Sequence, residues 1–268
     1  MDKGLEKIDR FLQYRLPGVF SSAVLKYVAA FFMLVDHAAV VMIMISHMMG
    51  LSASEQNKVI DTYRIMRHLG RFSFPVFCFF ISEGYCYTKN KIRYLCNLIV
   101  FGIISEIPFK KALFTDESIL NGKHSNVFFT LALGLLSVWC IDSFLTSRYT
   151  EASESIKRIP IWIRTIISAA VVSALCYIAY FFHTDYRHGG VIIIVLFFLF
   201  RHYPVFACCV AYAAICWYNR SELWSAPAFL MLMMYNGNRG RQSKYFFYIF
   251  YPLHLTFLCI IKEMLIKG

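Results

Sequence analysis

Charged residues are scarce in this sequence. Asp, Glu, Lys and Arg make up 16% of the 268 residues, whereas an ordinary soluble domain carries about a quarter. Apolar residues account for 59% and aromatic residues for 18%, and the mean hydropathy is +0.55. So little charge on so apolar a chain excludes an ordinary soluble enzyme. The composition predicts an integral membrane protein.

Three further absences narrow the function. The nine cysteines include no C-x-x-C pair, which leaves no redox or zinc motif to build on. No internal repeat is visible, although many transporters are built from inverted repeats. The longest expected connections, 51–67, 110–125 and 146–160, are too short to hold a soluble catalytic domain. Any chemistry must therefore take place within the membrane part or at its mouths.

Long apolar runs fill most of the chain. Crossing a bilayer as a helix takes about 20 apolar residues, and these runs are too continuous for the alternating strands of a membrane barrel. We expect an all-α polytopic bundle of about nine helices, forming a single domain over 1–268, with residues 1–20 as a cytoplasmic or interfacial segment. The expected helices are 24–48, 68–86, 94–109, 126–145, 161–182, 189–200, 203–218, 223–235 and 245–264.

Basic residues outnumber acidic ones, 27 to 16, which gives a net charge of +11. In a soluble protein this excess would suggest a nucleic-acid partner. Here the basic residues lie in the connections between apolar runs, so we expect membrane lipid and no nucleic acid around the protein. Their uneven distribution favours an inside N-terminus.

Asp36 and His37 stand side by side within the apolar run "MLVDHAAVV". A charged group at the centre of a spanning helix costs about 2.5–3.5 kcal/mol and marks a functional site by default. His37 lies roughly thirteen residues into its helix, near the middle of the bilayer. Neighbours in a helix point about 100° apart, so Asp36 and His37 each need a partner from another helix.

Other spans supply candidate partners. In "RHLGRFSFPVFCFFISEG", Arg71 and Glu83 are about three turns apart and cannot pair, and we expect Pro75 to kink this helix. The acid that pairs with Arg71 is expected to be Glu106 of "GIISEIPF" or Asp36.

A second imidazole, His254 of "FYIFYPLHL", is expected at the depth of His37. Together these groups predict a centre that binds ligands and transfers protons. The alternative for any one of them is a buried contact that only holds helices together.

Two polar stretches lie near the ends of helices. Asn126 and Thr130 of "NVFFTLALG" either donate hydrogen bonds into a cavity, or Asn126 caps the helix. The connection "FFHTDYRHGG", with Asp185, Tyr186 and Arg187, is expected to form a polar lid over the outer mouth. Its histidines lack the regular spacing of zinc motifs, so no metal site is expected.

Taken in order, "MLVDH", "LGRFSFPVFCFFISEG", "NVFFTLALG", "DYRHGGVIIIV" and "YIFYPLHL" resemble the TraX family of integral-membrane acetyltransferases, named for the N-acetylation of conjugative pilin. The resemblance covers about residues 26–257. It implies a multi-pass protein of the bacterial inner membrane that transfers an acetyl group from acetyl-CoA to an amine or hydroxyl of a pilin-like peptide or a glycan. It is also compatible with a homo-oligomer.

The resemblance and the chemistry of the residues together suggest roles. His37 is expected to be the general base, because a neutral imidazole can accept the proton of an attacking amine or hydroxyl. Arg71 would stabilise an oxyanion or a CoA phosphate, and Asp36 would act indirectly by holding Arg71. An acyl-enzyme on His37 is a variant of this mechanism. The expected pocket also includes Asn126, His254, Glu83, Glu106, Asp185, Tyr186 and Arg187.

The phosphates of CoA require basic residues at a membrane face. We expect these to be Lys89, Lys91, Arg93 and Arg158 or, with the opposite topology, Arg64, Arg67 and Lys110. Two other functions remain open. A proton-coupled transporter or channel would use Asp36, His37 and His254 as a relay, and a structural assembly factor would need none of this chemistry.

Overall fold

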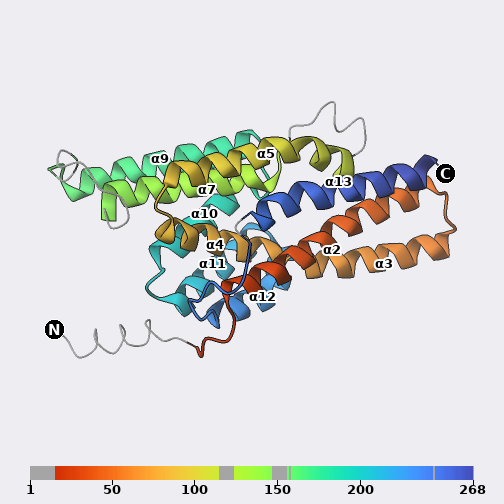
Figure 1. Ribbon diagram of the computed structural model, residues 1–268, viewed down its shortest axis with the longest axis horizontal. Coiled ribbons are helices and arrows are strands. Elements are labelled where there is room, and N and C mark those ends of the chain that lie inside the picture. Colours follow the sequence, from red (N-terminus) through yellow and green to blue (C-terminus); the bar gives the residue numbers. More distant parts are fainter. Residues whose placement is uncertain (1–15, 115–123, 147–155, 157, 244, 268) are drawn as a thin grey trace. The chain divides into compact units, whose positions relative to one another are not determined.

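The fold, a computed structural model, is described for residues 16–114, 124–146, 156, 158–243 and 245–267 (Figure 1). Within these ranges the regular structure is helical, and the only extended pairings are two isolated bridges, Phe20 with Tyr235 and Ser125 with Thr184. The predicted all-α fold is therefore confirmed. Residues 1–15 of the expected N-terminal segment lie outside the described residues.

Five of the described helices are long and apolar enough to cross a membrane. They are α2 (Ser22–Met48), α5 (Lys91–Leu113), α7 (Val127–Ile141) extended by the π-helical turn η1 (Asp142–Thr146), α9 (Ile161–Phe181) and α13 (Phe246–Lys267). The apolar helices α4 (Ser73–Tyr87), α10 (Arg187–Leu199), α11 (Pro204–Tyr218) and α12 (Ala226–Met233) are shorter.

The chain forms two compact units, and each is described by itself. Unit 1 comprises 1–77, 103–122 and 202–268, and unit 2 comprises 78–102 and 123–201. The boundaries fall inside α4 and α5. The expectation of a single domain stays a prediction.

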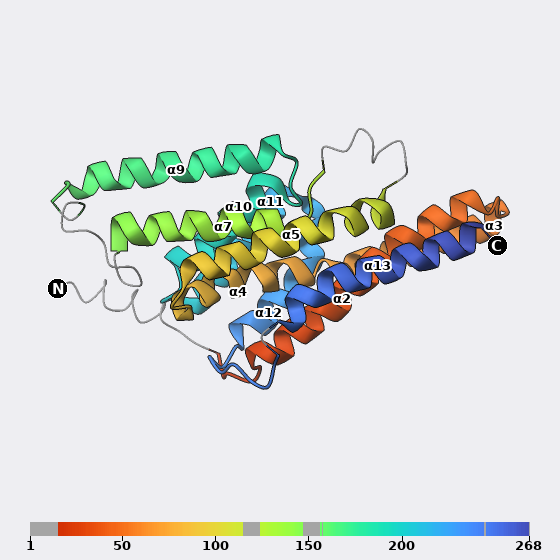
Figure 2. The ribbon, with the colours of Figure 1, turned by 45° about the horizontal axis from the view of Figure 1, so that its top comes forward.

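In unit 1, α2 is flanked by α3 (Ala53–Gly70) and α13 (Figures 1 and 2). The short turn after α2 makes α3 run antiparallel to it. By contrast, α13 runs parallel to α2. Tyr27 near the start of α2 contacts Phe246 at the start of α13, and Ile45 near the end of α2 packs with Leu258. The first half of α13 therefore lies alongside α2.

Helix α3 occupies a stretch that we expected to be a connection, and that expectation is wrong. Ser52 caps α3 in a capping box: its hydroxyl accepts from the Glu55 backbone N–H, and the Glu55 carboxylate accepts from the Ser52 backbone N–H. A search for apolar runs overlooks α3 because its outer face is charged. The S-x-x-E pattern at its start was the signal that could have found it.

The expected span 68–86 is also wrong, because the chain breaks between α3 and α4. Arg71 is the C-terminal cap of α3, and α4 begins at Ser73. Pro75 lies in the first turn of α4, where proline is tolerated because the N–H groups there have no helical partner. It therefore follows a break and does not kink a continuous helix.

The remaining part of unit 1 consists of short elements. The expected helix 223–235 divides into a 3₁₀ helix, η2 (Arg220–Ser225), and α12. The chain before α2 pairs with the segment after α12: Val19 N–H donates to the Met234 carbonyl, and Asn236 N–H donates to the Phe20 carbonyl. These bonds hold the start of α2 in place.

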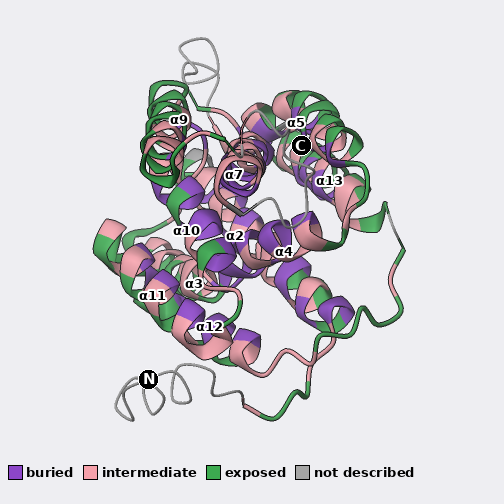
Figure 3. Ribbon diagram, turned by 90° about the vertical axis from the view of Figure 1, so that its left-hand side faces the viewer, coloured by how far each residue is buried: buried purple, intermediate pink, exposed green. Residues whose placement is uncertain are grey.

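In unit 2, α7, α9 and α10 pack on one another. Gly134 lets α7 approach α10 closely, because a methyl group there would overlap Ile194. Figure 3 shows that α9 is largely exposed, and its only buried residues are Ser168 and Ala179. So apolar a helix with so little buried surface is suited to face lipid.

Candidate functional site

Two histidines meet at the centre of the α2–α13 packing. His37 Nδ1 lies 2.8 Å from His254 Nε2, within hydrogen-bond distance. The two rings are parallel to within 3°, and the Tyr251 ring packs against both in an edge-to-face arrangement. Both histidines are buried, with exposed fractions of 9% and 5%. The structure thus brings together the two imidazoles that the sequence placed at similar depth.

A backbone carbonyl completes this contact. His254 Nδ1 lies 2.8 Å from the carbonyl oxygen of Phe250, one turn earlier on α13. A carbonyl oxygen only accepts hydrogen bonds, so His254 Nδ1 carries a proton and donates it. His254 is therefore held at both ring nitrogens.

Asp36 forms an ion pair with Arg67 of α3. The sequence suggested that Asp36 holds Arg71, but its ion-pair partner is Arg67, one turn earlier on the same helix. Gly70 permits this contact because a methyl group at that position would overlap the Asp36 side chain. The pair is shielded, with side-chain exposures of 17% for Asp36 and 28% for Arg67.

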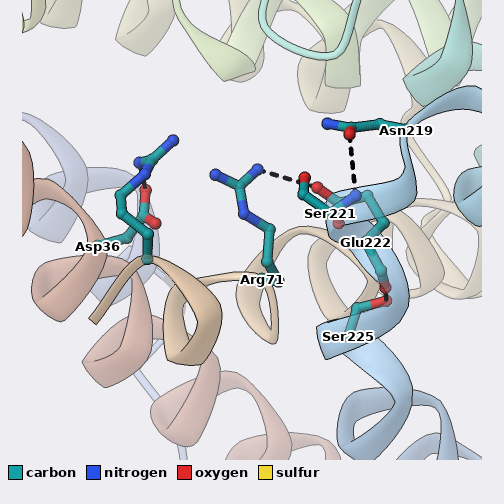
Figure 4. A network of polar contacts seen from close by, with 7 residues as sticks. Asp36, Arg71, Asn219, Ser221, Glu222 and Ser225 are labelled. Carbon is teal, nitrogen blue, oxygen red and sulfur yellow. Dashed lines mark hydrogen bonds and ion pairs between the residues drawn. The ribbon is translucent and has the colours of Figure 1, made fainter. Parts of the chain in front are cut away.

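Arg71 forms an ion pair with Glu222 of η2, with 2.9 Å between Nη1 and Oε1 (Figure 4). The Glu222 side chain is fully buried, and Figure 4 shows Arg71 between Asp36 and Glu222. Glu222 was not predicted because it lies between the expected helices 203–218 and 223–235. Asn219, which caps η2 by accepting from the Ser221 N–H, is the local signal of an ordered turn there.

The two other predicted acids have other surroundings. Glu106, a suggested partner of Arg71, forms an ion pair with Lys110 one turn further along α5 at 3.3 Å. Glu83 is partly buried on α4 and belongs to unit 2. The structure therefore places Asp36, His37, Arg71 and His254 in one unit with Glu106, and the roles assigned to these residues stay predictions.

Asn126 and Thr130 are fully buried and engaged within unit 2. Asn126 Oδ1 accepts from the Phe128 N–H, which caps α7, and Asn126 Nδ2 donates to the Gly102 carbonyl at 2.8 Å. The Thr130 hydroxyl bonds to the Thr184 hydroxyl at 2.9 Å. The capping alternative for Asn126 is confirmed, and its role in a pocket stays a prediction.

The expected lid is a tight turn between α9 and α10. His183, Tyr186 and Arg187 all adopt positive φ, at 48°, 59° and 44°, which is uncommon for residues other than glycine. The turn is fixed to the start of α7, since the Asp185 N–H donates to the Ser125 carbonyl at 3.0 Å. This anchoring opposes a freely moving lid.

His124 lies beside this turn, and its ring contacts His183. Burial lowers the pKa of His124 below its ordinary value, and the nearby His183 and Arg187 lower it further. The surroundings of this turn therefore disfavour a positive charge on His124.

The basic residues proposed for CoA differ in exposure. Lys89, Arg93 and Arg158 are exposed. Lys91 is buried, with its ammonium bonded to the Tyr85 carbonyl and lying 4.1 Å from the centre of the Tyr85 ring. The Tyr85 hydroxyl in turn donates to Asp142 at 2.9 Å. Lys91 is thus a less suitable phosphate ligand than the other three.

Among the described residues, no group of three or more His, Cys, Asp or Glu side chains is arranged to hold a metal ion. The chemistry available to the unit 1 site comes from the two imidazoles, two carboxylates and two guanidinium groups described above.

Comparison with known proteins gives two findings. The chain is 26% identical over 274 residues to the probable fimbrial assembly protein FimC, serogroup H1, of Dichelobacter nodosus, covering 92% of this chain and 97% of the relative. No solved structure matches the chain. The family described as "TraX protein" matches residues 21–262. This match covers most of the sequence, and the chain therefore belongs to the TraX family.

Proposed function

We propose that this protein is a membrane-embedded acetyltransferase, with His37 as its general base. The observation that carries the proposal is the buried contact between His37 and His254 inside two apolar helices. An imidazole is the side chain best suited to accept a proton near neutral pH. Placing two imidazoles in an apolar region costs free energy, and ionisable residues in such a position mark a functional site by default.

In the proposed reaction, an amine or hydroxyl of the acceptor attacks the thioester carbon of acetyl-CoA. His37 takes the acceptor's proton as the new C–N or C–O bond forms. The C–S bond then breaks, and His37 passes the same proton to the sulfur, so that the products are the acetylated acceptor and CoA. Arg71 is the candidate to stabilise the oxyanion, because a guanidinium favours negative charge that develops in a water-poor site.

The Asp36–Arg67 pair supports this assignment through its position. Arg67 is bound to Asp36, the residue that precedes His37. Because the two opposite charges compensate each other, Asp36 leaves no unpaired negative charge of its own beside His37 that would favour an imidazolium. Asp36 is thus proposed to orient Arg67, a correction of the earlier expectation that it holds Arg71.

Acetyl-CoA is proposed as the acyl donor. Its phosphates require exposed cations, which Lys89, Arg93 and Arg158 provide in unit 2. Exposed Arg64 of α3 is the alternative that corresponds to the opposite topology. The two alternatives are tested by removing the charges of Lys89, Arg93 and Arg158 in one protein and the charge of Arg64 in another. The variant with reduced CoA binding identifies the cations that bind the phosphates.

A pilin-like peptide is the proposed acceptor. The support is the similarity to a probable fimbrial assembly protein of Dichelobacter nodosus, together with the pilin acetylation associated with the TraX family. A glycan hydroxyl is the chemical alternative. Both acceptors are polar, and the charged outer face of α3, which runs along α2 toward Asp36, is suited to border the water from which they arrive.

The test is to incubate the purified protein in lipid with acetyl-labelled acetyl-CoA and measure released CoA and labelled product. His37→Ala should abolish turnover while expression and helix content are retained. His47→Ala is the matched control, because His47 is an exposed histidine on the same helix. Absence of CoA binding and of turnover in the wild-type protein would refute the proposal.

The similarity to a probable fimbrial assembly protein also supports a second candidate function, assembly of fimbriae, which needs no catalytic step. An assembly factor would retain its function with His37→Ala and with Arg71→Ala. Complementation of a fimbriation defect by these two variants therefore separates the two functions. A proton-coupled transporter would instead move protons across vesicles in the absence of acetyl-CoA.

A further inference from the structure

We propose that His254 is a positioning residue that fixes the protons of His37. Through its bond to the Phe250 carbonyl, it holds His37 as the tautomer protonated at Nδ1 and leaves Nε2 as the proton-accepting atom. The proton arrangement follows from the geometry alone. Its catalytic consequence rests on the proposed function.

The assignment starts from the carbonyl. Because the Phe250 oxygen only accepts, His254 Nδ1 must carry a proton. A neutral imidazole has one N–H, so His254 Nε2 is then a bare acceptor. At 2.8 Å from this atom, His37 Nδ1 must be the donor. Since neutral His37 also has one N–H, its Nε2 keeps a free lone pair.

His37 Nε2 makes no hydrogen bond to any residue that the structure describes. Within the described part of the chain, the nitrogen with the free lone pair is therefore also the one that no protein group binds. The opposite tautomer of His37 would turn its Nδ1 lone pair toward the lone pair of His254 Nε2. It would break the bond and place a proton on the atom that has to accept one.

The same contact limits the charge of the pair. Two imidazolium rings would place two N–H groups in one 2.8 Å gap, so the pair holds at most one extra proton. Arg67 of α3 is the charged group that acts on His37, and it is itself paired with Asp36 of α2. From α13, Tyr251 contacts both rings. This surrounding favours a neutral resting pair.

During the proposed reaction, the acceptor's proton arrives at His37 Nε2, and the proton between the rings can move toward His254 Nε2. The positive charge is then shared by two rings, with His254 Nδ1 still bonded to the carbonyl. When the proton on His37 Nε2 leaves for the thiolate sulfur, the shared proton returns to His37 Nδ1. No proton is gained or lost over the cycle, and no oxidant or reductant is needed.

Nitrogen-15 NMR of histidine-labelled protein in lipid tests the arrangement without any substrate. Protonated and bare ring nitrogens have well-separated shifts, and spectra of His37→Gln and His254→Gln assign the two residues. We expect His37 to be protonated at Nδ1 and bare at Nε2. In His254→Phe, His37 should become a mixture of tautomers. A wild-type His37 that is protonated at Nε2 would overturn the proposal.

Kinetics provide the second readout. A glutamine at position 254 can present an oxygen near the former Nε2 and accept from His37, whereas phenylalanine cannot. We expect His254→Phe to lower kcat by about 10²-fold or more, with KM for acetyl-CoA nearly unchanged, and His254→Gln to restore at least a tenth of the activity. His47→Gln is the control that should retain wild-type kcat. Equal loss in the Phe and Gln variants would refute the positioning role.

The two readouts also separate this proposal from the function on which it rests. If the wild-type protein shows no acetyl transfer while His37 has the expected tautomer, the proposed function fails and the proton arrangement stands. If turnover is present and the tautomer is the opposite one, His254 does not position His37.

Discussion

Gly70 of α3 lies directly against the side chain of Asp36 in the middle of α2, where a methyl group would overlap the carboxyl-bearing chain. This close approach allows Arg67, one turn earlier on α3, to reach Asp36. A glycine here is thus required by the packing of two helices around a buried acid and not by a turn.

Gly70→Ala should therefore disturb the site. The added methyl must push the two helices apart, and overpacking of this kind costs about 1–3 kcal/mol. We expect a lower Tm in detergent and weaker pairing of Asp36 with Arg67. Leu69→Ala, at the exposed neighbouring position of the same helix, is the control and should change the Tm little. A Gly70→Ala protein as stable as Leu69→Ala would contradict this packing.

The Arg71–Glu222 pair should behave as a buried pair. Removing one partner leaves an uncompensated buried charge, which costs about 3–5 kcal/mol. We expect Arg71→Met and Glu222→Leu each to lower the Tm strongly and the double variant to recover most of the loss. The matched control is Arg64→Met, which breaks an exposed pair with Asp61 and should cost at most about 1 kcal/mol. Additive losses in the double variant would contradict a direct coupling of the two residues.

The sequence was sufficient for the all-α fold, for most of the helices and for placing His37 and His254 at the same level. Apolar runs report burial in lipid or protein, and a histidine within such a run is conspicuous. The contact between His37 and His254 also requires that α2 and α13 pack side by side in parallel. This packing depends on tertiary structure that no local sequence pattern encodes.

The two ion pairs of the site were not predicted from the sequence, and both omissions have the same cause. The charged helix α3 and the acid of η2 lie outside the apolar runs, so Arg67 and Glu222 were not assigned as partners of Asp36 and Arg71. Arg67 and Arg71 are four residues apart, a spacing that places two helical residues on one face. This spacing could have suggested two acidic partners, one for each arginine. The identity of those acids depended on the chain breaks before α4 and at η2.

The outer face of α3 should be in contact with water, although α3 packs along the apolar helix α2. Glu55, Lys58, Asp61 and Arg64 are exposed on it, and each charge would cost about 2.5–3.5 kcal/mol in lipid. We expect a cysteine introduced as Arg64→Cys to react rapidly with a water-soluble maleimide in membranes, as measured by mass spectrometry of the labelled peptide.

The matched control for this labelling is Ile103→Cys. Ile103 is equally accessible on the protein surface, at 61% exposed, but belongs to the apolar face of α5, which we expect to contact lipid. It should react slowly because a thiolate does not form in hydrocarbon. If both cysteines react at the same rate, surface exposure alone does not distinguish water from lipid, and the water-facing assignment of α3 is wrong.

Acid should destabilise the turn that joins α9 to α10. Burial first, and then the charges of His183 and Arg187, lower the pKa of His124 in the folded protein, whereas in the unfolded chain it returns to about 6.5. Between these two values the unfolded chain binds more protons, so stability falls as the pH is lowered through about 6.5 and toward the lower folded pKa. This titration depends on the imidazole of His124.

His124→Gln removes the titrating imidazole. The decrease in Tm between about pH 7.5 and about pH 5.5 should therefore be smaller in the variant than in the wild-type protein. His47→Gln, which leaves the turn intact, should show the wild-type decrease. His183→Gln should give an intermediate decrease, because it relieves the repulsion on His124 but not its burial. An unchanged pH dependence in His124→Gln would mean that this histidine is solvated well enough to keep its ordinary pKa.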